Sequence, residues 1–162
     1  MAAPHAALAI TQALRGARAP RGGALWAPIL EELPLFSGVP KRHLRSIAAL
    51  TRESRYRPGS AIVREGRRAD DFFVLLEGEA SILRSGHPPI SIGPGSYFGE
   101  MALLDGGPRS ATIVAETEVH CLRLPRAPFL RMVRERPEIA LALLRELARR
   151  VRELQEARAL VS

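Results

Sequence analysis

The sequence predicts an α+β fold, in which helices precede and follow a central antiparallel β region. Apolar residues between Ile29 and Leu50 recur at helical spacing. From Tyr56 to Leu124, short apolar or alternating runs are separated by glycine and proline at intervals of about 8–12 residues, which is typical of an antiparallel roll, jelly roll or sandwich. After Leu124 the helical spacing returns and continues almost to the end of the chain.

The first 27 residues differ in composition from the rest of the chain. They contain no acidic residue and are rich in alanine, arginine, glycine and proline, so that no long helix is expected there. We interpret residues 1–27 as a flexible leader with a short helix near 6–14, and residues 28–162 as one domain. Trp26 is expected to cap this domain. An organelle transit peptide is also compatible with an acid-free start that contains arginine, although the leader is poor in serine.

The domain is expected to contain several short elements and one long one. Helices are expected within 29–36 and over 41–50, 101–104, 125–133 and 137–160. Strands are expected over 61–64, 72–76, 80–85, 90–92, 111–115 and 119–124. Pro137-Glu138 is a favourable helix start, because proline suits an early helical position and an acid suits its positive end. About 24 residues at 1.5 Å each give the last helix a length of about 36 Å.

Charge and composition exclude some classes of protein and leave others open. The net charge is +7, but the basic residues are spread from Arg15 to Arg158 among carboxylates, so the charge does not identify a nucleic-acid-binding face. No apolar run approaches the roughly 18 residues that span a membrane. The single cysteine, Cys121, excludes an internal disulfide and is compatible with a reducing compartment. We therefore expect a cytoplasmic protein.

The sequence indicates neither a catalytic site nor a metal site. No serine–histidine–aspartate or cysteine–histidine arrangement is apparent, and no convincing pair of carboxylates suggests acid–base catalysis. His5, His43, His87 and His120 share no metal-ligand spacing with each other or with Cys121. His120 and Cys121 adjoin in an expected strand and should face opposite sides of it. We expect a protein that is not an enzyme.

One segment combines the residue types that an anionic ligand needs. It reads FGEMALLDGGPRSAT from Phe98 to Thr112. Gly99 lets the backbone approach a ligand closely, and the first amides of the short helix expected there favour an anion. Arg109 carries a fork of donors suited to phosphate, whereas Glu100 can accept a hydrogen bond from a hydroxyl. Gly106-Gly107-Pro108 permits the tight return that brings the arginine beside the helix start.

This segment resembles the phosphate-binding cassette of the cyclic-nucleotide-binding domain family, which bacterial catabolite activator proteins, protein kinase A regulatory subunits and cyclic-nucleotide-gated channels share. The family's Phe-Gly-Glu, apolar pair and Pro-Arg-small-Ala-Thr are matched from Phe98 to Thr112. Further matches lie at Arg57-Pro58-Gly59, Arg64-Glu65-Gly66, Phe73-Val74-Leu75 and Glu77-Gly78-Glu79. The resemblance covers residues 29–156. It implies a jelly-roll-like antiparallel β-roll flanked by N-terminal helices and a long C-terminal helix.

The resemblance also implies roles for individual residues. Glu100 would hold the ribose 2′-hydroxyl and Arg109 would pair with the cyclic phosphate. The implied ligand-binding set is Gly99, Glu100, Met101, Ala102, Arg109, Ser110 and Ala111. Serine after the arginine occurs in bacterial cAMP regulators, and its hydroxyl could also serve a guanine, so cAMP is favoured and cGMP stays open. No other cofactor is implied.

The last helix is expected to be apolar on more than one side. One face would cover the roll, where Arg150 and Gln155 are candidates for purine contacts, although Leu154 stands where catabolite activators carry threonine. Another face could meet a partner helix and make a homodimer, or the helix could pack only on its own domain.

Together these features predict a regulatory sensor. Ligand binding would move the C-terminal helix and so change contact with an unidentified effector protein. Three alternatives stay open: a fragment of a catabolite-activator-type transcription regulator without its helix-turn-helix, a piece of a channel, transporter or enzyme, and a family member that has lost its ligand. No DNA-binding element is visible after the long helix, and no membrane partner is expected.

Overall fold

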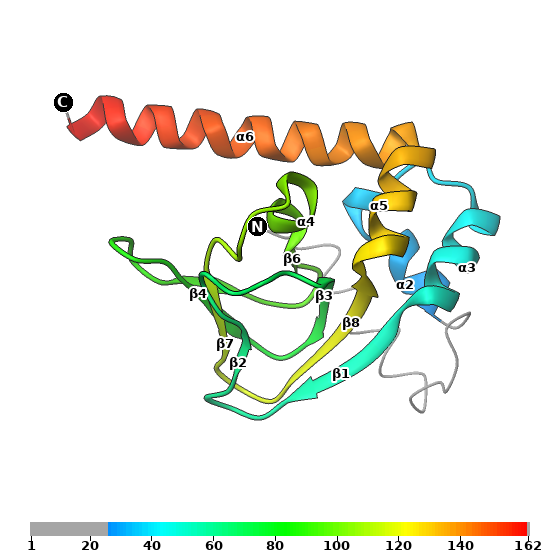
Figure 1. Cartoon of the computed structure of the whole chain (residues 1–162), viewed down its shortest axis with the longest axis horizontal. Helices are drawn as coiled ribbons and strands as arrows, with labels where there is room; N and C mark the ends of the chain where they lie inside the picture. The colour runs from blue at the N-terminus through cyan, green and yellow to red at the C-terminus, as the bar shows by residue number, and fades with distance from the viewer. Residues whose placement is uncertain (1–25, 162) are drawn as a thin grey trace.

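Two four-stranded antiparallel sheets form the centre of the molecule (Figure 1). The computed structural model describes residues 26–161, and in this part of the chain the strand orders are β1-β8-β3-β6 and β2-β7-β4-β5. Helices α2, α3 and α5 gather at one end of the sheets, and α6 runs along the molecule above them (Figure 1). The predicted α+β roll with flanking helices is therefore confirmed.

The element boundaries agree closely with those expected. The helices are α2 (Ala27–Glu31), η2 (Pro34–Phe36), α3 (Lys41–Leu50), α4 (Glu100–Asp105), α5 (Arg126–Glu135) and α6 (Pro137–Val161). The strands are β1 (Arg52–Tyr56), β2 (Ala61–Val63), β3 (Asp71–Glu77), β4 (Ala80–Leu83), β5 (Ile90–Ile92), β6 (Tyr97–Phe98), β7 (Thr112–Ala115) and β8 (Val119–Pro125). Two strands, β1 and β6, were not predicted. β1 is a polar strand at the edge of its sheet, and β6 has only two residues, so neither produces an apolar run.

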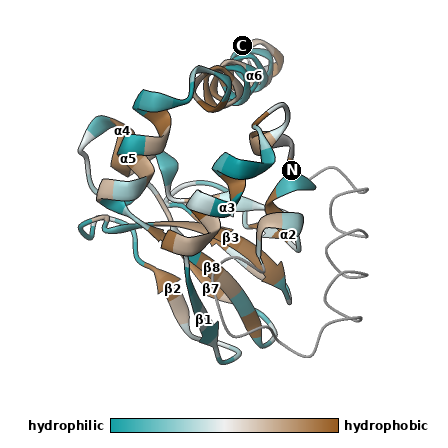
Figure 2. Cartoon of the chain, turned by 90° about the vertical axis from the view of Figure 1, so that its right-hand side faces the viewer, coloured by the Kyte–Doolittle hydropathy of each residue, from teal (hydrophilic) through white to brown (hydrophobic). Residues whose placement is uncertain are grey.

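Strand β3 separates two hydrophobic clusters because its side chains alternate between the faces of the sheet. Phe72, Val74 and Leu76 belong to the cluster that the helices cover, whereas Phe73 and Leu75 belong to the cluster inside the roll. Figure 2 shows strong hydrophobic colouring on β3, β8 and β7, whereas β1 is hydrophilic. The sheet β1-β8-β3-β6 therefore packs against the helices on one face and lines the interior of the roll on the other.

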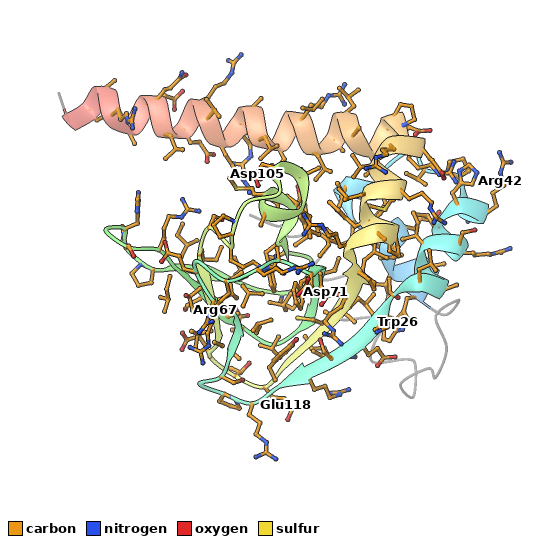
Figure 3. The ribbon with its side chains drawn as sticks, in the orientation of Figure 1. Trp26, Arg42, Arg67, Asp71, Asp105 and Glu118 are labelled. Carbon is orange, nitrogen blue, oxygen red and sulfur yellow. The ribbon has the colours of Figure 1, made fainter. Side chains whose placement is uncertain are left out.

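Trp26 is a buried member of the helix-side cluster (Figure 3). Its indole N–H donates to Oε1 of Glu53 at 3.2 Å, and Nε2 of His120 lies 3.1 Å from Oε2 of the same carboxylate. His120 thus faces the helices, while Cys121 belongs to the cluster inside the roll, as the expected alternation requires. The predicted leader and its short helix lie outside the described residues, apart from Trp26 and Ala27 at its end.

The helices in the described part of the chain are too short or too polar to cross a membrane. Within residues 26–161, no group of three or more histidine, cysteine, aspartate or glutamate side chains is placed to hold a metal ion.

Candidate functional site

The segment from Phe98 to Thr112 forms a loop around the short helix α4, which lies beneath α6 (Figure 1). A glycine in the left-handed conformation stands at each end of this helix: Gly99 has φ 91° and Gly106 has φ 72°. Asp105 accepts a hydrogen bond from the main-chain N–H of Gly107 at 2.8 Å and so closes the turn after the helix. The predicted tight return toward Arg109 is confirmed.

Arg109 is a buried cation held by main-chain oxygens. Its guanidinium donates to the carbonyl of Asp71 at 2.7 Å and to the carbonyl of Gly99 at 3.2 Å. The Asp71 carboxylate lies instead 3.4 Å from Arg123, and Figure 3 shows Asp71 at the centre of the molecule. Burial lowers the pKa of Arg109, while Asp71, Asp70 and Glu100 oppose that shift. Because these two hydrogen-bond acceptors are neutral carbonyls, the positive charge of Arg109 can still balance the charge of a bound anion.

Glu100 is buried at the start of α4 and is paired with the long helix. Its Oε1 accepts a hydrogen bond from Arg150 at 2.7 Å, and Arg150 also donates to Glu146 at 3.1 Å. Burial acts to lower the pKa of Arg150, but Glu100 and Glu146 outweigh it, so that this pKa is raised. A charged contact therefore joins the cassette to α6, 50 residues further along the chain.

The structure brings the cassette residues together, places Arg150 beside them and leaves Gln155 apart. Ala102 and Ala111 are buried beside Glu100 and Arg109, whereas Met101 and Ser110 are exposed at the surface of the loop. Arg150, a candidate for purine contact, is bonded to Glu100. Gln155 lies on the exposed far part of α6. Sequence reasoning missed the Glu100–Arg150 pair, because nothing in either segment marks its distant partner.

Gly99 is expected to tolerate a side chain less well than Gly106. An added Cβ at Gly99 would lie 2.5 Å from Nη1 of Arg109 and 3.0 Å from the carbonyl oxygen of Asp71, whereas a Cβ at Gly106 meets nothing within 4 Å. Both substitutions place alanine in the left-handed conformation, which lowers the free energy of unfolding by about 1–2 kcal/mol. Gly99→Ala should cost about 1–3 kcal/mol more, because neighbours must also move. Urea unfolding of both variants checks this, and equal losses would contradict it.

Comparison with known proteins gives consistent matches. The sequence profile of the cyclic nucleotide-binding domain matches residues 53–136, slightly more than half of the chain. A cAMP-dependent protein kinase regulatory subunit from Aspergillus niger is 40% identical over 111 residues, which are 67% of this chain and 27% of that protein. This chain therefore spans about a quarter of the length of that curated relative.

Two solved structures show the same arrangement of strands and helices. A catabolite activator protein from Thermus thermophilus has a TM-score of 0.71 and 32% identity, over 79% of this chain and 62% of that one. The regulatory domain of Toxoplasma gondii PKA, in a co-crystal with cAMP, has a TM-score of 0.70 and 27% identity, over 77% of this chain and 49% of that one. The β-roll predicted from the sequence is thus a known fold.

Proposed function

Because the chain belongs to the cyclic nucleotide-binding domain family, we propose that it is a regulatory module that binds a cyclic nucleotide and prefers cAMP to cGMP. The observation that carries this proposal is Arg109, a residue that is only 6% exposed and whose guanidinium donates to the main-chain carbonyls of Gly99 in the cassette and Asp71 on β3. The role proposed is binding, and no catalytic step is assigned to the module.

The chemistry of a cyclic nucleotide suits the groups that the cassette offers. A cyclic phosphate carries one negative charge, and burying that charge without a cation would cost many kcal/mol. Arg109 supplies the cation and a planar fork of donors. Oε2 of Glu100 can accept from the ribose 2′-hydroxyl while Oε1 stays with Arg150. The main-chain amides proposed to complete the phosphate site are those of Gly99, Met101 or Ala102, and Ser110.

The preference for cAMP has two supports. The Aspergillus niger relative is named a cAMP-dependent kinase subunit, and the Toxoplasma gondii domain was crystallised with cAMP. Ser110 follows the cassette arginine, where bacterial cAMP regulators carry serine and proteins that prefer cGMP often carry threonine.

Calorimetric titration of the full chain tests the proposal. We expect saturable binding of cAMP, weaker binding of cGMP, and weaker binding still of 5′-AMP, whose open phosphate has a different shape and charge. Absence of binding by either cyclic nucleotide to protein with an intact circular dichroism spectrum would overturn the proposal. Tighter binding of cGMP than of cAMP would overturn the stated preference alone.

Helix α6 is the element that we propose to move on ligand binding and so to transmit the signal. Glu100 contacts the ligand in this proposal and Arg150 at the same time, so the position of α6 depends on what occupies the cassette. A ligand shifts a conformational equilibrium only when it binds one arrangement more tightly than the other. The Glu100–Arg150 pair provides this difference in affinity, because the same carboxylate binds the ribose in this proposal and pairs with the arginine of α6.

Arg150→Gln is expected to uncouple α6 from the ligand. Spin labels at Leu160→Cys and His87→Cys, both at exposed positions, can report the distance between the far end of α6 and the β4–β5 turn by double electron–electron resonance. Burial raises the pKa of Cys121 to about 12, so the native thiol should stay unlabelled. cAMP should shift the mean distance by several ångström in the otherwise unchanged chain, and this shift should be lost with Arg150→Gln.

Arg149→Gln is the matched control for this experiment. Arg149 adjoins Arg150 and carries the same charge, but its ion pairs are with Glu146 and Glu153 on its own helix. The distance shift should therefore survive this substitution. A shift that survives Arg150→Gln equally well would contradict the coupling.

A second copy of the chain is the proposed partner of α6. Five large apolar side chains in the described part of this helix are exposed: Leu141, Leu144, Val151, Leu154 and Leu160. Leu144 and Val151 are seven residues apart, which is the repeat of a two-helix coiled coil. We expect a dimer in sedimentation at micromolar concentration and a monomer for Leu144→Glu with Val151→Glu. Ile90→Glu, at an exposed apolar residue of β5, should leave the dimer intact. A wild-type monomer would contradict this proposal.

A further inference from the structure

Two neighbouring strands supply both the carbonyls and the aromatic rings around Arg109. β3 gives the carbonyl of Asp71 and, two residues later, the ring of Phe73; β6 ends with Phe98, and the carbonyl of Gly99 follows it directly. The guanidinium carbon of Arg109 lies over the Phe73 ring, 5.6 Å from its centroid. This separation is within the range of about 6 Å for a cation–π interaction.

The Phe73 ring has a fixed orientation. Phe73 and Phe98 are paired across β3 and β6, and their rings stack 4.9 Å apart with planes only 9° from parallel. Both side chains are buried in the cluster inside the roll. Because Phe98 supports one face of the ring and close-packed neighbours surround it, Phe73 cannot turn away from the guanidinium without disturbing the core.

We propose that Phe73 is a positioning residue for ligand binding, whose π face sets the plane of the Arg109 guanidinium and so aims its remaining donors at the phosphate. This inference rests on the proposed function. Two carbonyl acceptors fix two N–H directions, and a flat support beneath the group restricts its rotation. A buried cation benefits from such a ring more than an exposed one, because water competes less for it.

Fluorination of the ring tests this role, because it weakens the negative π face with little change in size. The full chain would carry 4-fluoro-, 3,5-difluoro- or 3,4,5-trifluorophenylalanine at position 73, and cAMP affinity would be measured by calorimetry. We expect the affinity to fall with each added fluorine, to about one tenth for the trifluoro ring, while the unfolding temperature of the ligand-free protein changes little. The same series at Phe72, whose ring lies on the other face of β3 and stacks on Phe129, should show no such trend.

A second measurement in the ligand-free chain separates this inference from the proposed function. Nitrogen-15 relaxation of the Arg109 guanidinium reports its rotation, which should become faster along the fluorine series at Phe73 and stay constant along the series at Phe72. Constant rotation in both series would overturn the positioning role, whether or not cAMP binds. Unchanged affinity along the Phe73 series in a chain that binds cAMP would also overturn it. A rotation trend in a chain that binds no cyclic nucleotide would refute the proposed function and retain the positioning.

Discussion

Arg109→Ala is expected to lower the affinity for cAMP by at least about 100-fold, which corresponds to about 2.8 kcal/mol. The substitution removes the buried cation that opposes the phosphate charge, and charge-assisted hydrogen bonds to phosphate are among the strongest in proteins. It also leaves the carbonyls of Asp71 and Gly99 without the donor that satisfies them. Calorimetric titration at fixed ionic strength measures the loss, with urea unfolding to confirm that the variant is folded.

Two further variants give this result its meaning. Arg109→Lys keeps the charge but replaces the planar fork by a single ammonium, so we expect an intermediate loss of about tenfold or more. Arg55→Ala removes the same charge from β1, where the side chain pairs with the exposed Glu118, and should bind cAMP as the wild type does. Equal affinities for the wild type and Arg109→Ala would rule out the arginine as the phosphate partner.

Gly78→Ala is expected to cost about 3–5 kcal/mol of unfolding free energy, a large fraction of the stability of a domain. Gly78 lies in the turn between β3 and β4 at φ 90°, and an added Cβ would lie 2.1 Å from the main-chain oxygen of Glu118. Left-handed backbone costs alanine about 1–2 kcal/mol. The clash with the backbone of Glu118 would also push the β3–β4 turn away from the β7–β8 turn. Hydrogen bonds between Glu79 and the turn at 116–117 would stretch or break as a result.

Gly86→Ala is the matched control for this substitution. Gly86 also has a positive φ, at 75°, but a Cβ there meets nothing within 4 Å. It should therefore show the backbone cost alone, about 1–2 kcal/mol. Urea unfolding of both variants measures the difference, and a loss at Gly78 no larger than that at Gly86 would contradict the predicted clash.

Local patterns made much of this structure predictable. The cassette could be identified because its glycines, Glu100 and Arg109 lie within one short segment. The amphipathic helix over 41–50 agrees with α3 because the turn that ends at Pro40 marks its start and its apolar residues recur at helical spacing. Strand β1 escaped prediction because an edge strand with polar side chains takes its order from pairing with β8, which no local pattern records.

The contacts around the cassette arginine could not be predicted for a different reason. Asp71 accepts the hydrogen bond from Arg109 through its main-chain carbonyl. Every residue carries this group, so the amino-acid sequence does not indicate which carbonyl is the acceptor. Arg150 meets Glu100 only because α5 and the start of α6 carry the chain back over the roll. The last helix contains several arginines, so the sequence does not indicate that Arg150 is the one that pairs with Glu100.

Helix α6 continues well past its last contact with the cassette. Residues 151–160 are all exposed, and at 1.5 Å per residue they extend about 15 Å beyond Arg150. A rotation of about 15°, the size of known rigid-body switches, would move the far end of this segment by about 4 Å. The helix would thus act as a lever with its fulcrum at Arg150, turning a sub-ångström change beside Glu100 into a displacement that a bound protein can detect.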